Sequence, residues 1–304
     1  MEQRRRIAAY GICRDDHRVL LVRYGTAELG VWQVPGGGLG HGEHPAAALV
    51  RVVREQAGLE VEATGVRAVV ADVIQRPDLG IALHTDRVIY EMGVPDGRLR
   101  AGGVGAPAPV AWVPSGELSR LRLMPFTAEL LGIPAVPLPP EALPSADLSP
   151  QAPPLPGAVP VPARVQGQRF AAYGLVTDPA GRVLLTQIAD GYPGAGRWHL
   201  PGGGTDHGEQ PVAALLRELV EESGQLGRVM HLLDVSHRHD PNAMGPEGYP
   251  IDWHVVRAIY RVVVDLPSEP TVTEAAGSTA QARWFTPAEV KALLLTGVAA
   301  AALG

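Results

Sequence analysis

The sequence predicts a mixed α/β protein in which one small unit occurs twice in tandem. Its 304 residues suit two domains of ordinary size better than one large domain. Motifs of the first half return in the second half in the same order. Each half also shows the same succession of short β-branched runs, a glycine-rich turn, one amphipathic helix, further strands and a short closing helix. This succession predicts a mixed sheet with few helices in each copy.

The internal repeat is the observation that decides the architecture. The matched segments, by residue number, are 6–12 with 169–175, 18–21 with 182–185, 32–38 with 198–204, 41–43 with 207–209, 84–90 with 254–260, and 111–112 with 283–284. Chance similarity would not preserve this order along the whole chain. The pattern therefore predicts a duplicated unit.

A proline-rich stretch separates the two copies. Residues 134–162 contain eleven of the 29 prolines of the chain and almost no charged side chains. Such a stretch cannot sustain a helix or a sheet ladder and favours extended chain. We therefore expect a first domain over 1–133, a linker over 134–165 and a second domain over 166–304. The linker is either a plain spacer or a strap whose leucine and valine side chains pack on a domain surface.

The composition limits the classes of partner and of compartment. With 26 basic and 32 acidic residues, the net charge of −6 leaves no electrostatic footprint for a nucleic-acid polymer. The single cysteine, Cys13, excludes an intramolecular disulfide and reads as a small core hydrophobe. No run approaches the roughly 18 apolar residues that a membrane span needs, and the N-terminal apolar stretch is too short for a signal peptide. We expect a soluble cytoplasmic protein without a membrane partner.

The candidate chemistry lies on one helix of the second copy, which we expect over about residues 210–222. Pro211 suits the first turn of this helix and Gly224 its end. Three glutamates follow at i, i+3 and i+4, a spacing that places them on one face: Glu218, Glu221 and Glu222. Their mutual repulsion favours a bound divalent cation, and hard oxygen ligands suit Mg²⁺ or Mn²⁺.

An ordinary solvated acidic face is the alternative interpretation of this helix. In that case Arg217 would simply be the i, i+4 partner of Glu221. The fixed distance of the acidic face behind a glycine-rich loop and behind Glu209 favours the metal-binding interpretation.

With that spacing, the segment resembles the box of the Nudix hydrolases. The box reads Gly, five residues, Glu, seven residues, Arg-Glu-hydrophobic-x-Glu-Glu-x-Gly-hydrophobic. The positions filled in order are Gly203, Glu209, Arg217, Glu218, Leu219, Glu221, Glu222 and Gly224. Only the last position departs, because Gln225 stands where the family packs an apolar residue in its core. The resemblance implies two Nudix folds in tandem, each a mixed sheet between helices in an α/β/α sandwich.

The resemblance also implies an activity and roles for the residues. The activity is metal-dependent hydrolysis of the pyrophosphate bond in a nucleoside diphosphate linked to another group. The implied metal ligands are Glu218, Glu221, Glu222 and the carbonyl of Gly203, holding Mg²⁺ or Mn²⁺. Arg217 and Glu209 would pair to fix the loop before the helix, and either Glu222 or Glu218 would be the general base. Expected contacts to a small nucleotide substrate are Trp198, Arg197, His207 and Glu247.

The first copy keeps the frame of the box but loses its charge. Its matching positions include Gly37, Glu43, Arg51 and Glu55. Val52 and Gln56 replace two of the three helical glutamates, which removes most of the attraction for a divalent ion. We expect this copy to be catalytically inactive.

Several further features leave alternatives open. His231, His237 and His239, followed by Asp240, could form a metal site or could be ordinary loop histidines. A further acidic ligand behind the box could be Glu247 or Asp252. The chain could also be a non-catalytic nucleotide-binding or sensor protein, and the duplication is compatible with either a homodimer or an intramolecular pseudo-dimer of the two domains.

Overall fold

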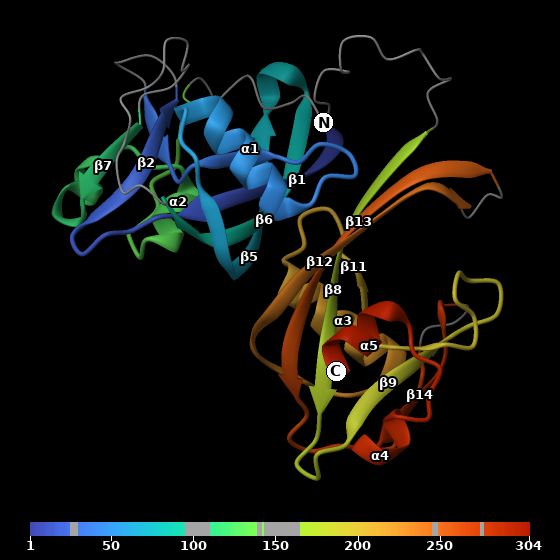
Figure 1. Cartoon of the computed structure of the whole chain (residues 1–304). Helices are drawn as coiled ribbons and strands as arrows, with labels where there is room; N and C mark the ends of the chain where they lie inside the picture. Colours follow the sequence, from blue (N-terminus) through green and yellow to red (C-terminus); the bar gives the residue numbers. More distant parts are fainter. Residues whose placement is uncertain (25–29, 95–109, 139–141, 143–164, 245–248, 274–276) are drawn as a thin grey trace. The chain divides into compact units, whose positions relative to one another are not determined.

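The computed structural model describes residues 1–24, 30–94, 110–138, 142, 165–244, 249–273 and 277–304 (Figure 1). It divides into two compact units. The first unit comprises Met1–Gln168 together with His239–His254, and the second comprises Arg169–Arg238 together with Val255–Gly304. Each unit contains one copy of the glycine-rich strand and of the helix that follows it. No helix in the described part of the chain is both long enough and apolar enough to cross a bilayer.

The first unit is built from two small sheets and few helices. Its strands are β1 (Glu2–Ile12), β2 (Arg18–Tyr24), β3 (Val31–Gln33), β4 (Gly36–Gly38), β5 (Glu62–Arg76), β6 (Ile81–Gly93) and β7 (Val110–Pro114). One sheet has the order β4-β1-β6-β5 and the other the order β3-β2-β7. The pairing of β1 with β6 is parallel, whereas β1 with β4 and β5 with β6 are antiparallel. The sheet is therefore mixed, as the sequence predicts.

Two helices belong to this unit: α1 (Pro45–Ala57) and the short α2 (Pro125–Leu130). Helix α1 begins at a proline, is capped by the His44 side chain and ends at Gly58 in the left-handed conformation. Its apolar side packs on the sheet, with Leu49 and Val53 completely buried. The part of the proline-rich stretch that is described lies close to this unit, because Leu138 and Ala142 pack against its core. Residues 139–141 and 143–164 lie outside the described residues.

The second unit repeats this plan. Its strands are β8 (Gln166–Thr177), β9 (Val183–Ile188), β10 (Trp198–His199), β11 (Gly202–Gly204), β12 (Arg228–Met244), β13 (Pro250–Val263) and β14 (Thr279–Phe285), of which β12 and β13 extend into the segment His239–His254 of the first unit. The sheet order is β10-β9-β8-β13-β12, with β11 added on β8 and β14 on β9. Its helices are α3 (Pro211–Ser223), α4 (Pro287–Val290) and α5 (Gly297–Leu303). The predicted class, mixed α/β with few helices, is confirmed in both units.

Cys13 and Gln225, two residues that the sequence singles out, are both buried. Cys13 is buried, with 6% of its surface exposed, as predicted for a core hydrophobe. Gln225 is also buried, and both ends of its side-chain amide form hydrogen bonds with Ser268. Its Nε2 donates to Ser268 Oγ at 3.0 Å, and its Oε1 accepts from the Ser268 N–H at 3.0 Å. A polar residue is tolerated at this core position because both ends of its amide are hydrogen-bonded.

Candidate functional site

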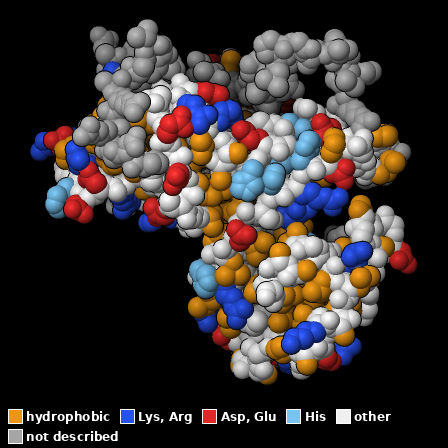
Figure 2. Space-filling view, in the orientation of Figure 1, with side chains coloured by type: hydrophobic (Ala, Val, Ile, Leu, Met, Phe, Trp, Pro, Cys, Tyr) orange, Lys and Arg blue, Asp and Glu red, His pale blue; other side chains and the backbone are white. Residues whose placement is uncertain are grey.

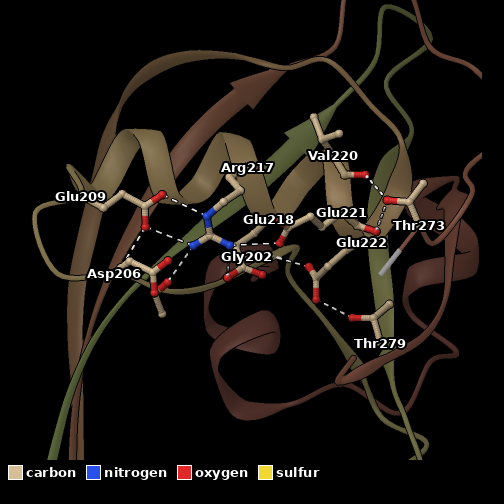
Figure 3. Close-up of polar contacts among 11 residues, drawn as sticks. Gly202, Asp206, Glu209, Arg217, Glu218, Val220, Glu221, Glu222, Thr273 and Thr279 are labelled. Atoms are coloured by element: carbon tan, nitrogen blue, oxygen red, sulfur yellow. Dashed lines mark hydrogen bonds and ion pairs between the residues drawn. The ribbon is translucent and has the colours of Figure 1, made fainter. Parts of the chain in front are cut away.

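The three glutamates of the second copy stand on the last two turns of α3. The helix starts at Pro211, where a missing N–H costs nothing, and stops at Gly224 with φ 68°. The expected bounds of about 210–222 are therefore confirmed to within one residue. Figure 3 shows the Glu222 carboxylate directed toward Gly202 of β11 and the Arg217 guanidinium lying between Glu209 and Glu218.

Arg217 forms the centre of a charged network around this helix. Its Nε and Nη2 donate to the two carboxylate oxygens of Glu209 at 3.0 and 3.1 Å, and Nη2 also reaches the Gly204 carbonyl at 3.2 Å. Its Nη1 donates to Glu218 at 3.1 Å and to Glu221 at 3.0 Å (Figure 3). The fork of Arg217 thus joins the loop to the helix, and it offsets part of the repulsion between the two glutamates. The hydrogen bond with Glu209 raises the pKa of Arg217, so the guanidinium stays charged.

Glu209 also fixes the loop that leads into the helix. Its Oε2 accepts from the Asp206 N–H at 2.9 Å, and its own N–H donates to the Asp206 carbonyl at 3.1 Å. A carboxylate that is bonded to both a guanidinium and a backbone N–H holds the loop in one conformation. Glu209 therefore connects the loop before α3 to Arg217 on the helix.

Strand β11 brings backbone close to the carboxylates. Gly203 has no side chain, and a Cβ at this position would lie 2.5 Å from the carboxyl carbon of Glu218. Glu222 is 4% exposed and accepts hydrogen bonds from the Gly202 N–H at 2.8 Å and from the Thr279 hydroxyl (Figure 3). Glu222 therefore ties β11 and β14 to the helix, and Glu218 lies over Gly203.

A group of polar side chains that the sequence did not predict, Tyr173, His199 and Arg257, lies beside this site. Tyr173 of β8 pairs with Gly202, and its ring centroid lies 4.6 Å from that of His199. Burial raises the pKa of Tyr173, and burial lowers the pKa of Arg257, which hydrogen-bonds Tyr173. Burial, followed by the charge of Arg257, lowers the pKa of His199 to about 4, and His199 Nδ1 lies 2.7 Å from the Thr296 hydroxyl. His199 is consequently neutral at physiological pH.

Only weak signals in the sequence could have revealed this group of polar side chains. Tyr173 belongs to the repeated Ala-Ala-Tyr-Gly motif, and His199 follows the repeated tryptophan. Both signals read equally well as core features. Their proximity to the box depends on pairing between distant strands, which single-sequence patterns do not specify.

The first copy reproduces the arginine network with nearly the same geometry. Arg51 donates to the two oxygens of Glu43 at 2.8 and 2.7 Å, and it reaches the Gly38 carbonyl at 3.2 Å. It also donates to Glu55 at 3.2 Å. Burial by itself would raise the pKa of Glu43, but the hydrogen bonds from Arg51 and from the Gly40 N–H outweigh it, so the net pKa is lowered. The frame of the box is therefore intact in both copies.

The two copies differ at the positions that carry charge. Val52 stands where Glu218 stands in the second copy, and a Cβ on Gly37 would lie 3.1 Å from its Cγ1. Gln56 stands in place of Glu222 and donates its Nε2 to the Gly36 carbonyl at 3.2 Å. The hydrogen bond between helix and strand has thus reversed direction, from a carboxylate that accepts a backbone N–H to an amide that donates to a carbonyl.

A family model described as NUDIX domain matches residues 2–132 and 167–302. The chain belongs to the Nudix family. The two matched segments confirm that Nudix folds occur in tandem.

Similar proteins include a curated relative and several solved structures. Over 46 residues the chain is 52% identical to an RNA pyrophosphohydrolase from Acidiphilium cryptum (strain JF-5), a stretch that covers 15% of this chain and 28% of that relative. The chain thus matches less than a third of that relative's length. The Nudix domain of Shewanella oneidensis NrtR, solved with ADP ribose, is 20% identical over 45% of this chain and 85% of its own, with a TM-score of 0.37. A MutT Nudix hydrolase from Burkholderia pseudomallei is 28% identical over 45% and 97%, with a TM-score of 0.35.

The predicted substrate contacts of the Nudix site have different surroundings. Trp198 packs edge-on against Phe285, with ring centroids 4.6 Å apart, and its equivalent Trp32 makes matching backbone hydrogen bonds, which favours a structural role. Arg197 is exposed and donates to the Leu295 carbonyl at 3.2 Å. His207 is half-buried in the loop before α3, and Glu247 lies outside the described residues.

Among the described residues, the candidates His231, His237, His239 and Asp240 do not bring their ligand atoms together as one group. His231 is exposed, and Asp240 accepts from the Asn242 N–H at 3.1 Å. His239 instead lies 2.6 Å from Asp252, with Nε2 facing Oδ1, in the first compact unit. Asp252 was a candidate for a further acidic ligand of the Nudix box, but its carboxylate is engaged with imidazole groups.

Proposed function

We propose that the second copy hydrolyses a phosphoanhydride bond in a nucleoside diphosphate linked to another group, with Mg²⁺ or Mn²⁺ as cofactor. The observation that carries this proposal is the set of three glutamates on one side of α3, two of them joined to the guanidinium of Arg217 and the third joined to β11. A folding requirement alone does not explain why three carboxylates gather beside a glycine strand.

The residues present fit a hard divalent cation. The carboxylates of Glu218, Glu221 and Glu222 and the backbone of Gly203 offer only oxygen donors, the ligand type that Mg²⁺ and Mn²⁺ prefer. Gly203 also leaves space that a Cβ would fill beside Glu218. When bound, such a cation offsets negative charge on phosphoryl oxygens and lowers the pKa of a water molecule.

We assign separate tasks to the residues of the box. Arg217 and Glu209 hold the loop and the helix in register. Glu222, buried and hydrogen-bonded from two sides, positions the glycine strand against the helix. Glu218, with 15% of its side chain exposed over Gly203, is the residue we assign as general base, which takes the proton of the attacking water.

We further propose that the first copy does not hydrolyse this bond. Val52 is 6% exposed and supplies an apolar group where a base is needed, and Gln56 carries no charge. Glu55, which is exposed, and Glu43, which is paired with Arg51, are the carboxylates that the first box retains. The first copy would serve as a scaffold or pairing half. We propose that the first domain spans 1–133 and the second 166–304, and the family matches to 2–132 and 167–302 support these boundaries.

A release assay with excess Mg²⁺ tests this function. The panel contains nucleoside triphosphates, ADP-ribose, dinucleoside polyphosphates, nucleotide sugars and a 5′-triphosphorylated RNA, the last because a relative is described as an RNA pyrophosphohydrolase. We expect wild type to hydrolyse at least one small nucleotide and Glu222→Gln to lose most of that activity. Gln can still accept from Gly202 and bond Thr279, so the fold should survive. Equal release by both proteins on every compound would support a non-catalytic nucleotide-binding or sensor protein instead.

A further inference from the structure

A second cluster of ligand-type side chains lies in the first compact unit, and none of its residues belongs to the intact Nudix box of the second copy. It consists of His41, His239 and Asp252, whose ligand atoms all lie within 4.8 Å of one another. His41 belongs to the loop between β4 and α1, His239 to β12 and Asp252 to the neighbouring strand β13. Two neighbouring strands and a loop about 200 residues earlier in the sequence therefore bring their side chains to one point.

The distances within this cluster suit a single small cation. Asp252 Oδ1 lies 2.6 Å from His239 Nε2 and 3.1 Å from His41 Nε2. In a tetrahedral zinc site with bonds of about 2.0–2.2 Å, ligand atoms stand about 3.3 Å apart. Small side-chain movements would therefore convert the cluster into such a site.

The surroundings of the cluster hold its rings in place. His41 is 12% exposed, and its ring meets those of His239 and the completely buried His254 edge to face, at 5.4 and 5.7 Å. Gly42 has φ +76°, and a Cβ there would lie 2.6 Å from His239 Nδ1, so a glycine is required for the ring to approach. Burial would raise the pKa of Asp252, but its hydrogen bonds with His239 and His41 lower the net value.

We propose that His41, His239 and Asp252 bind a divalent transition-metal ion, Zn²⁺ by ligand chemistry, through two imidazole nitrogens and one carboxylate oxygen. Two histidines and one carboxylate leave a further coordination position for water or another oxygen ligand. This site differs in kind from the oxygen-only Nudix box, because imidazole favours zinc-like ions over Mg²⁺. Of the predicted group His231, His237, His239 and Asp240, His239 is the member that belongs to this site.

Calorimetric titration of the full chain, stripped by chelator and kept in excess Mg²⁺, tests this site. The excess Mg²⁺ saturates oxygen-only carboxylate sites, so Zn²⁺ reports on the imidazole cluster. We expect one Zn²⁺ per chain, and a visible tetrahedral-type spectrum when Co²⁺ replaces it. Asp252→Asn and His239→Ala should each weaken binding by more than about 100-fold, the upper range for loss of a mere outer-shell partner.

Two controls make the result specific. His231→Ala removes an exposed histidine outside the cluster and should bind Zn²⁺ like wild type. Glu218→Gln alters only the Nudix box and should also retain Zn²⁺ binding, which separates this proposal from the proposed hydrolase function. Circular dichroism identifies any variant that fails to fold. In Asp252→Asn the new side chain has nearly the same size as the aspartate that it replaces. Absence of Zn²⁺ binding under excess Mg²⁺, or binding that Asp252→Asn and His239→Ala leave unchanged, would overturn the proposal.

Discussion

The arginine of each box shows how one side chain can be structural in both copies while its neighbours decide function. Arg217 and Arg51 make the same bidentate contact with a glutamate eight residues earlier and the same contact with a glycine carbonyl. What differs is the side chain one position later, glutamate at 218 and valine at 52. The frame and the chemistry of the box are therefore separable at the level of single residues.

Replacing each arginine by lysine should show that both arginines contribute to stability but that only Arg217 contributes to hydrolysis. A lysine ammonium cannot reproduce the planar fork, so Arg217→Lys and Arg51→Lys should each cost about 1 kcal/mol of folding free energy, measured by urea unfolding. Hydrolysis should fall at least about tenfold for Arg217→Lys, which corresponds to about 1.4 kcal/mol in the barrier, and should be unchanged for Arg51→Lys. Equal losses of activity in the two variants would contradict the assignment of the site to the second copy.

His199 should make the folding stability depend on pH. Its pKa is lowered to about 4 in the folded protein, against an ordinary value of 6.5, so the unfolded chain binds the proton more readily. Stability should be complete above about pH 6.5 and should fall as the pH drops toward 4, by up to about 3 kcal/mol. Urea midpoints measured across this range for wild type and His199→Gln test this, because the variant should show a flatter dependence. A parallel decline in both proteins would remove His199 as the cause.

At the scale of secondary structure, the sequence predicts some elements better than others. The bounds of α3 could be predicted because Pro211 and Gly224 are local signals with local causes. The contacts of Glu222 with Thr279 and of Gly202 with Tyr173 could not, because strand pairing between distant segments depends on the whole sheet. The glutamates of the box and their partner Arg217 were identifiable from the sequence, but the contacts of Glu222 with Gly202 and Thr279 were not.

Strand β11 and helix α3 can be tested together through Gly203. In Gly203→Ala the new Cβ would meet the Glu218 carboxyl group, which is the flexible end of a side chain and can move away. We therefore expect a small change in melting temperature but a loss of most of the hydrolytic activity, because Glu218 is displaced. Gly37→Ala is the matched control, since its Cβ would meet Val52 at 3.1 Å and Gln56 at 3.7 Å, and it should leave activity unchanged. An active Gly203→Ala protein would argue against a tightly positioned Glu218.

For the molecule as a whole, the duplication could be predicted from motif order, and the two family matches bear it out. The membership of His239–His254 in the first compact unit could not be predicted, because the sequence assigns this segment to the second copy. Figure 2 shows acidic and basic side chains interspersed over the face in view. The boxes of the two copies differ in charge, because Val52 and Gln56 stand where the second copy has Glu218 and Glu222.

Restoring the missing charges in the first copy tests this difference. The double variant Val52→Glu with Gln56→Glu recreates three helical carboxylates beside Gly37. We expect one additional Mn²⁺ to bind per chain, detected by the loss of the free Mn²⁺ electron-paramagnetic signal, with a cost in stability because Val52 is buried. Leu59→Met, a conservative change elsewhere in the same box, provides the comparison. Unchanged Mn²⁺ stoichiometry in a folded double variant would show that carboxylate number is not what the first copy lacks.

The central claim is that turnover depends on the carboxylates of α3 in the second copy. Its most direct test is the steady-state rate of Mg²⁺-dependent pyrophosphate cleavage for wild type, Glu218→Gln and Glu55→Gln measured side by side on the best substrate of the panel. The account predicts a loss of about 10²- to 10⁴-fold for Glu218→Gln, as for removal of a general base, and a wild-type rate for Glu55→Gln. A Glu218→Gln protein that turns over at the wild-type rate, or a Glu55→Gln protein that does not turn over, would contradict it.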